Sequence, residues 1–138
     1  MIIVSKKIPK PRVYVAGPYS CKNYCPGISV SLVAMREGIQ ACMALIHDDM
    51  IPFCPWLDFM LALMDHEGTL PKTFFYEYSN AFLVVCDAVY IHKFVKSRTG
   101  ILNEMILADK NNIPVINDYM KLIQWRNKWI KEQGLSRH

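Results

Sequence analysis

The stretch from Asp87 to Pro114 constrains the fold of this chain more than any other segment. It begins with a short apolar run, 88–91, which is typical of a buried strand. A polar loop follows, and from Thr99 the apolar residues recur at helical spacing, which predicts a helix. A second short apolar run, 113–116, comes after that helix. Strand, loop, helix and strand in this order form the unit that builds parallel sheets, so the stretch predicts an α/β fold.

The segments before and after this stretch continue the alternation of strands and helices. Apolar runs at 12–16 and 50–53 predict two further strands, and helices are expected from Ile28 to about Asp48, around 74–82 and from Met120 to about Glu132. In the first helix the apolar residues recur in steps of four and three and are expected to form its inner face: Ile28, Leu32, Met35, Ile39, Cys42 and Ile46. The whole chain, 1–138, is therefore predicted to be a single domain with a flavodoxin/Rossmann-like three-layer fold and a parallel sheet of roughly four to five strands.

Composition narrows the class of protein. No apolar run approaches the roughly 20 residues that a membrane-spanning helix needs, so no membrane association is expected. The chain has 5 cysteines, an odd number, and its first residues carry no export signal, so reduced thiols and a cytoplasmic location are expected.

The net charge of +4 suits a small anionic ligand as well as a nucleic acid. A nucleic-acid partner is disfavoured, because the basic face of the last helix lacks interleaved aromatic residues for stacking.

Polar residues gather where strands are expected to end and helices to begin, which is where ligands bind in such sheets. One polar segment, Gly17 to Ser20, follows the first strand, and another, Ser97 to Gly100, precedes the helix of the central stretch. The second segment offers hydroxyl groups, a guanidinium and the amides of a helix start, which together favour an anion such as phosphate. Glu104 lies about one turn into that helix, where its carboxylate could point back at the loop.

Several of these segments together resemble a known family. The runs V-Y-V-A-G-P-Y-S, I-P-F-C-P, C-D-A-V-Y-I and S-R-T-G-I-L-N-E, in this order, are similar to the nucleoside 2-deoxyribosyltransferase superfamily, in particular to its short phage and bacterial-type members. The resemblance covers residues 12–117 and implies one nucleoside 2-deoxyribosyltransferase-like domain. It implies N-glycosidic bond chemistry, by hydrolysis or deoxyribosyl transfer, on a nucleoside or nucleoside 5′-monophosphate. It implies no metal and no organic cofactor, and a homo-oligomer, a dimer or larger. Trp125 and Trp129 could lie at a subunit interface, because such aromatic residues are enriched in interface cores.

The resemblance also implies roles for individual residues. Glu104 would be the nucleophile that attacks the sugar, and Tyr14 would orient it, although a buried core tyrosine is an equally good interpretation of Tyr14. Trp56, together with Phe59, could form an aromatic wall for the base. The remaining candidates are expected to contact the sugar, the base or a 5′-phosphate: Gly17, Pro18, Tyr19, Ser20, Asp58, Ser79, Ser97, Arg98, Thr99 and Gly100.

The chain departs from the family at Ser79. The well-studied enzymes have an aspartate at this position that handles protons on the base, and a serine cannot serve as that general acid near neutral pH. Asp58 could supply a carboxylate instead. Base exchange, hydrolysis, an altered substrate and a non-catalytic nucleotide-binding protein therefore all stay open. The ionisation of Glu104 is open too, because the helix start and Arg98 favour the carboxylate whereas burial opposes it.

Overall fold

The computed structural model describes residues 8–17, 28–55, 61, 64–65, 68–92 and 99–136. Four strands form one sheet within these residues, namely β1 (Arg12–Ala16), β2 (Ile51–Phe53), β3 (Ala88–Ile91) and β4 (Val115–Ile116). Four helices are described, namely α1 (Ile28–His47), α3 (Lys72–Leu83), α4 (Thr99–Lys110) and α5 (Tyr119–Ser136). All strand pairs are parallel, in the order β2-β1-β3-β4. The predicted α/β fold with a parallel sheet is confirmed.

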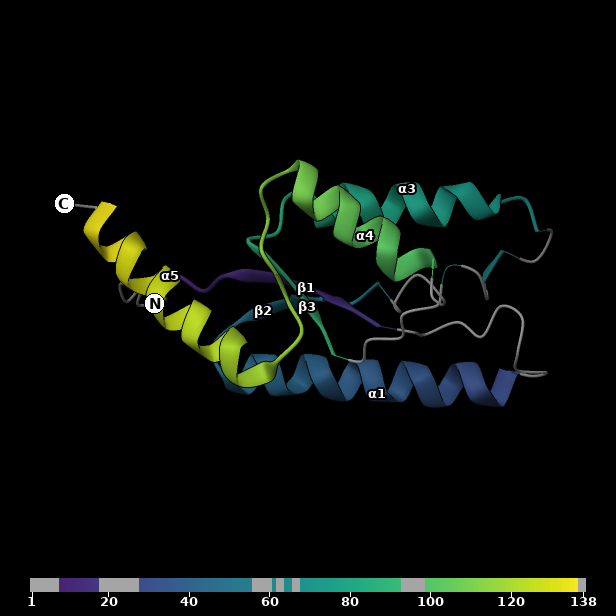
Figure 1. Cartoon of the computed structure of the whole chain (residues 1–138). Helices are drawn as coiled ribbons and strands as arrows, with labels where there is room; N and C mark the ends of the chain where they lie inside the picture. Colours follow the sequence, from purple (N-terminus) through teal and green to yellow (C-terminus); the bar gives the residue numbers. More distant parts are fainter. Residues whose placement is uncertain are drawn as a thin grey trace, which may run out of the picture.

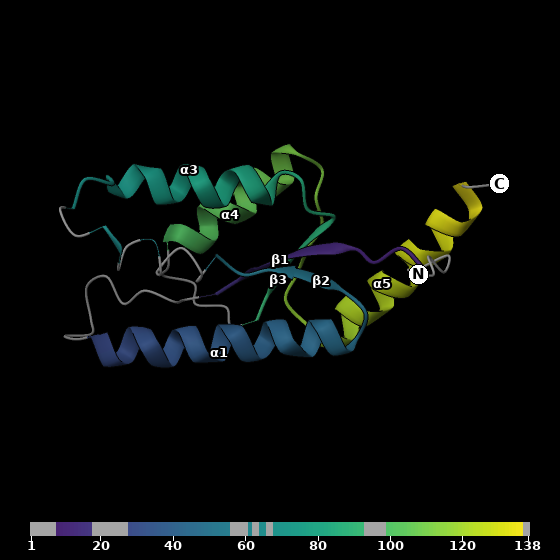
Figure 2. The same ribbon diagram turned by 180° about the vertical axis from the view of Figure 1, so that it is seen from behind.

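The helices cover both faces of the sheet and make three layers (Figures 1 and 2). α3 and α4 lie on one face, and α1 and the first turns of α5 lie on the other. This arrangement follows from the parallel strands, because each return to the same edge of the sheet requires a crossover, usually helical, that packs on a face. The flavodoxin/Rossmann-like architecture that the sequence predicts is therefore the one observed.

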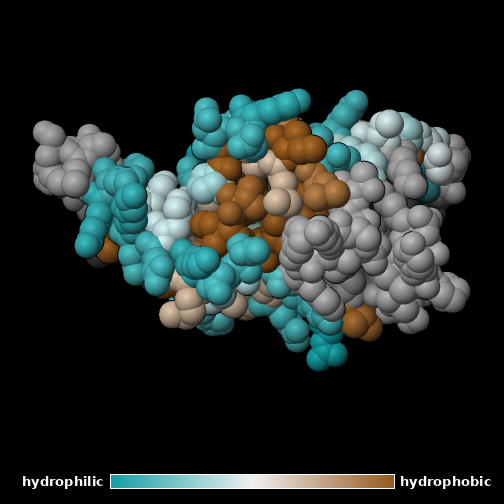
Figure 3. All heavy atoms as spheres, viewed as in Figure 1, coloured by the Kyte–Doolittle hydropathy of each residue, from teal (hydrophilic) through white to brown (hydrophobic). Residues whose placement is uncertain are grey.

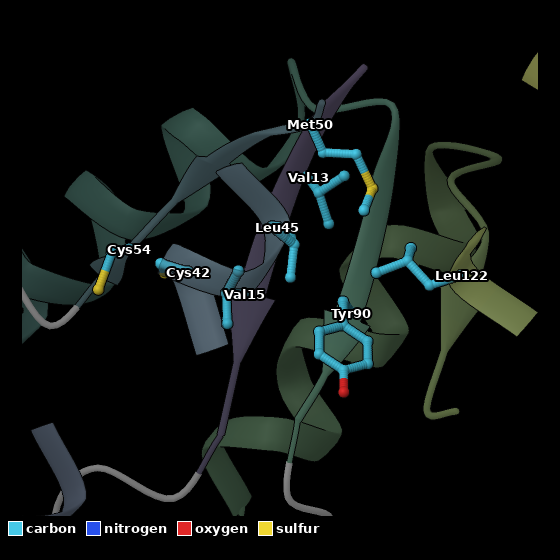
Figure 4. Packing of buried hydrophobic residues seen from close by; sticks show 8 residues of the cluster. All are labelled: Val13, Val15, Cys42, Leu45, Met50, Cys54, Tyr90 and Leu122. Atoms are coloured by element: carbon cyan, nitrogen blue, oxygen red, sulfur yellow. The ribbon is translucent and has the colours of Figure 1, made fainter. Parts of the chain in front are cut away.

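The central strands β1 and β3 are buried on both faces. In β1, Val13 and Val15 point toward α1 and α5, whereas Tyr14 and Ala16 point toward α3 and α4, as the alternation of a strand requires. Figure 4 shows the first group packed with residues of α1, β3 and α5 such as Leu45. Fully burying one such aliphatic side chain contributes about 1.5–3 kcal/mol. The run V-Y-V-A is suited to a central strand because none of its side chains is charged. Two of them pack into the apolar layer on one face of the sheet, and the other two pack into the layer on the opposite face.

The edge strands β2 and β4 are short. β4 was expected over 113–116, but only Val115–Ile116 is paired with β3. The reason lies in the turn before it, where Asn112 has a φ of 57° and closes α4. Ile113 then packs against the core on the α4 side of the sheet without forming a strand. Short edge strands leave little unpaired backbone for contact with other chains.

The inner face of α1 differs from the one predicted. Ile39 and Ile46 were expected to be buried, but 42% and 49% of their surfaces are exposed. Cys42 is buried as expected, and Leu45, which was not expected, is completely buried beside it. The apolar residues of α1 extend around more than one side of the helix, so their spacing does not select a unique face. Contact with β1 and β2 selects the side that carries Cys42 and Leu45. The side chains of Ile28 and Leu32 lie outside the described part.

α5 is anchored to the end of α1 and then projects away from the sheet (Figure 1). The hydroxyl of Tyr119 contacts the carboxylate of Asp48, and Nη1 of Arg126 donates to the backbone oxygen of Asp48 at 2.6 Å. Leu122 is fully buried, and the Trp125 ring packs against the same core. None of the helices in the described ranges has the length and apolar character of a bilayer-spanning segment.

Candidate functional site

The carboxyl ends of all four strands meet at one edge of the sheet, because the strands are parallel. The chain leaves β1 through α1 toward β2, and it leaves β3 through α4 toward β4, on the opposite side of the central pair. The strand order therefore reverses between β1 and β3. A reversal of this kind opens a crevice outside the carboxyl ends of the two strands, and ligands bind there in open α/β sheets. We place the candidate site at the carboxyl ends of β1 and β3.

Tyr14 and Glu104 meet near this site, on the face of the sheet that α3 and α4 cover, with Tyr14 two residues before the end of β1. The hydroxyl of Tyr14 donates to Oε1 of Glu104 at 2.8 Å, and the Tyr14 side chain is completely buried. β1 positions Tyr14 because alternate residues of that strand face α4, and α4 presents Glu104 one turn after the buried Ile101. The two residues that the sequence predicted as catalytic are therefore in direct contact.

Burial raises the pKa of the Glu104 carboxyl to about 7, while the hydrogen bond from Tyr14 acts in the opposite direction. Glu104 lies beyond the first turn of α4, where the favourable field of a helix start has largely fallen off. Burial therefore has a larger effect on the pKa of Glu104 than the hydrogen bond from Tyr14. Both the protonated and the ionised form of Glu104 are consequently populated near neutral pH.

A group of aromatic rings from β2 and α3 packs beside Tyr14, each ring in contact with the next. The ring of Phe53 stacks on Tyr14 with centroids 5.6 Å apart, and on Phe82 with centroids 4.6 Å apart. Tyr78 lies 5.2 Å from Phe82 and 6.2 Å from Phe74. The sequence prediction assigned an aromatic wall to Trp56 and Phe59 and missed this group. The spacing of 74, 78 and 82 on one side of a predicted helix was the signal available for it.

Gly17 and His92 form a second close contact at this edge. A Cβ atom built on Gly17 would lie only 2.2 Å from Nε2 of His92. The backbone N–H of His92 donates to the oxygen of Ala16 at 3.1 Å. Sequence reasoning selected Gly17 but missed His92. The signal for His92 was its position directly after a predicted buried strand that ends at this edge.

Ser79 lies on the inward side of α3. It is the buried polar side chain among the described core residues, one turn before Leu83, which is completely buried. A side chain at this position faces the interior between α3, α4 and the sheet, so a carboxylate here would be directed inward as well.

Two of the remaining predicted residues, Thr99 and Gly100, belong to a described element, since they are the first residues of α4. The others lie outside the described residues: Pro18, Tyr19, Ser20, Trp56, Asp58, Phe59, Ser97 and Arg98. Within the described ranges, no three histidine, cysteine, aspartate or glutamate side chains are grouped so as to hold a metal ion.

Comparisons of the chain with protein-family models, with curated proteins and with solved structures found no match. The family resemblance therefore stays a prediction that depends on the sequence segments described above. The chemistry has to be inferred from the geometry of the site.

Proposed function

We propose that this chain cleaves the N-glycosidic bond of a nucleoside or nucleoside 5′-monophosphate, with Glu104 as the nucleophile. The observation that supports this proposal is the 2.8 Å hydrogen bond between Tyr14, two residues before the carboxyl end of β1, and Glu104 of α4. It holds one carboxylate in a partly buried position where α/β sheets bind small ligands. Retaining glycosidases use a carboxylate nucleophile for the same oxocarbenium-like chemistry.

The proposed reaction has two steps. Oε2 of Glu104 bonds to C1′ of the sugar while the bond between C1′ and the base nitrogen breaks, and the base leaves with the electron pair and takes up a proton. Water then attacks C1′, loses a proton and releases the sugar together with the free carboxylate. A second base in the place of that water would give deoxyribosyl transfer. Tyr14 holds Oε1 throughout, which fixes the direction from which Oε2 approaches C1′.

The aromatic group beside Tyr14 supports a substrate that carries a flat base. Phe53 and Phe82 stack nearly parallel, with an angle of 12° between their planes, and Phe82 keeps 41% of its surface exposed. Rings in this arrangement supply large apolar faces against which another ring can stack. We also expect a nucleoside 5′-monophosphate to bind better than a bare nucleoside, because the sequence places the cationic and hydroxyl side chains of Lys96, Ser97 and Arg98 just before α4.

A second candidate function is a nucleotide-binding protein without turnover. Ser79 favours it, because the family's general acid is absent from this inward-facing position. The pKa of about 7 for Glu104 favours it too, since a protonated carboxyl group cannot attack the sugar. Both candidates use the same site and the same ligand class, so they differ only in whether the bond breaks.

We also propose that the chain forms a homo-oligomer and is located in the cytoplasm. Figure 3 shows apolar surface over α4 and β4, and the exposed side chains there include Leu102 and Ile106, with 41% and 55% of their surfaces accessible. Contiguous apolar surface of this kind is typical of an interface core. Light scattering of the purified chain coupled to gel filtration would measure the number of copies.

The function is tested by incubating the protein with the common ribo- and 2′-deoxyribonucleosides and their 5′-monophosphates. Chromatography then measures the free base. Base release by the wild type, absent from the Glu104→Gln variant, is the expected result. Tight binding of a nucleotide without release would favour the binding protein, and the absence of both would end the proposal.

A further inference from the structure

Gly17 and His92 occupy equivalent places on neighbouring strands. Each is the first residue after its strand, since β1 ends at Ala16 and β3 ends at Ile91. Ala16 and Ile91 are register partners, and the hydrogen bond from His92 to Ala16 extends the pairing by one step. The two residues therefore face each other where the strand order reverses, at the candidate site.

The imidazole of His92 lies directly against the α-carbon of Gly17. A Cβ on residue 17 would be 3.2 Å from Cε1, 2.4 Å from Cδ2 and 2.2 Å from Nε2, and real Cβ atoms are essentially never found at the last two of these distances. Nε2 is buried in this contact. Among the described glycines, Gly68 has a positive φ and Gly17 does not. A Cβ on residue 17 would thus displace the imidazole from its present place, and what favours glycine here is the close ring and not the backbone conformation.

The contact joins the two segments that carry the proposed catalytic pair. Gly17 continues from the strand that holds Tyr14, and His92 continues from the strand that leads to α4 and Glu104. The edge of the ring formed by Nε2 and Cδ2 is the part that faces Gly17, so the contact between the ring and Gly17 is one of shape. A flat ring on a bare α-carbon permits a closer approach of the two segments than any residue with a Cβ would.

We propose that His92 is a positioning residue for the glycosidic bond cleavage proposed above: its ring, packed on Gly17, sets the separation of the ends of β1 and β3 at the candidate site. The inference rests on the proposed function. His92 acts through Gly17, and it is not assigned a contact with substrate or a proton transfer. A change in the ring should therefore alter substrate binding more than the chemical step.

A double-mutant cycle tests this inference with Gly17→Ala, His92→Ala and the combination of both. The readouts are kcat and KM for base release from the 2′-deoxynucleoside 5′-monophosphate that the wild type cleaves fastest, and Tm without ligand. Gly17→Ala should lower kcat/KM by about tenfold or more, mainly through KM, since misplacing a site by about an ångström can cost up to about a hundredfold. The double variant should recover at least about fivefold relative to Gly17→Ala, because residues in contact are non-additive and removal of the ring makes room for the Cβ.

Two further variants separate shape from other effects. Gly134→Ala makes the same substitution in α5, where a Cβ would meet nothing within 4 Å, and it should leave kcat and KM unchanged. His92→Phe keeps a flat ring and removes the nitrogen atoms. It should retain kcat/KM within about threefold, as a conservative ring replacement does, and keep the pH profile of the wild type. If Gly17→Ala does not fold, His92→Ala and His92→Phe still give the comparison.

Several results would overturn the inference. Additive losses in the double variant would show that the ring does not occupy the space that Gly17 leaves open. A change in Tm with unchanged kcat and KM would reduce the contact to ordinary packing, and a loss in His92→Phe as large as in His92→Ala would assign the role to a nitrogen. If the wild type binds a nucleotide but does not cleave it, the Kd of that nucleotide replaces kcat and KM as the readout of the same double-mutant cycle.

The outcomes also distinguish this inference from the proposed function. An active wild type with additive losses refutes this inference alone. A wild type that neither cleaves nor binds any nucleoside or nucleotide refutes the proposed function and this inference with it.

Discussion

The hydroxyl of Tyr14 and Oε1 of Glu104 are 2.8 Å apart although 90 residues separate them in the chain. Tyr14 is completely buried in the central strand β1, and Glu104 lies on α4, which follows the neighbouring strand β3. A buried phenol that donates to a carboxylate with a pKa of about 7 has consequences for activity, for pH dependence and for stability.

Glu104→Gln should abolish base release while nucleotide binding survives. The amide keeps the shape of the side chain but cannot form the glycosyl ester, so cleavage should fall by several orders of magnitude whereas Kd changes by about tenfold or less. With wild type and a 2-fluorinated sugar substrate, mass spectrometry should find a sugar adduct on the peptide that contains Glu104. Glu132→Gln, the same change on the exposed part of α5, serves as the control with full activity. Full activity in Glu104→Gln would exclude the proposed mechanism.

The activity should rise with pH through about 7. Only the ionised form of Glu104 can attack, and its pKa is raised from 4.5 to about 7 by burial. The ascending limb of kcat/KM against pH, measured for base release from pH 5 to pH 9, should therefore have its midpoint near 7. A midpoint near the ordinary value of a glutamate would mean that the carboxylate responsible is not the buried Glu104.

The free energy of unfolding should change with pH in the opposite direction to the activity. The folded protein binds the Glu104 proton more tightly than the unfolded chain does, so this group's contribution is fully present below 4.5 and is lost as pH rises through about 7. Relative to Glu104→Gln, the free energy of unfolding of the wild type should fall by on the order of 3 kcal/mol between pH 4.5 and pH 8. Urea unfolding of both proteins at several pH values measures this difference. A difference that does not vary with pH would refute the raised pKa.

Tyr14→Phe should move the activity profile toward alkaline pH. The hydrogen bond from Tyr14 lowers the pKa of Glu104, so its removal should raise that pKa further, by about 1–2 units for a hydrogen bond to a charged group. At pH 7 kcat should fall, with partial recovery at pH 9. Tyr90→Phe removes a hydroxyl from the adjacent strand on the opposite face of the sheet and should leave the profile unchanged. An unshifted profile in Tyr14→Phe would show that the bond does not govern Glu104.

Ser79→Asp should increase transfer of the sugar to an added free base. The new carboxylate would lie on the inward side of α3 and could exchange protons with the base, and general acid–base catalysis contributes about 10²–10⁴-fold, of which we expect at least tenfold. Asn80→Asp introduces the same charge on the next residue, which is exposed, and should not change transfer. No gain in a Ser79→Asp protein that still folds and binds nucleotide would mean that the site serves a different substrate or uses another proton donor.

Local sequence determined the elements and their order, because each signal depends only on neighbouring residues. The runs R-V-Y-V-A and A-V-Y-I could be recognised as strands from their composition, and β3 has the bounds that the sequence predicted. The start of α4 at Thr99 was also visible, since helical spacing begins there. Tyr14 and Glu104 were proposed as a pair only through the family resemblance. Neither residue carries a local signal that points to the other.

Tertiary structure decided what depends on packing between distant segments. Leu45 rather than Ile46 faces the core because contact with the sheet selects one side of an α1 that is apolar on several sides. His92 could not be selected from the sequence as the residue that requires glycine at 17, because the clash exists only once β1 and β3 lie side by side. The pKa of Glu104 was open for the same reason. Whether this pKa is raised or lowered depends on how far the folded chain removes the carboxylate from water. Burial is a property of the assembled layers and not of any local segment.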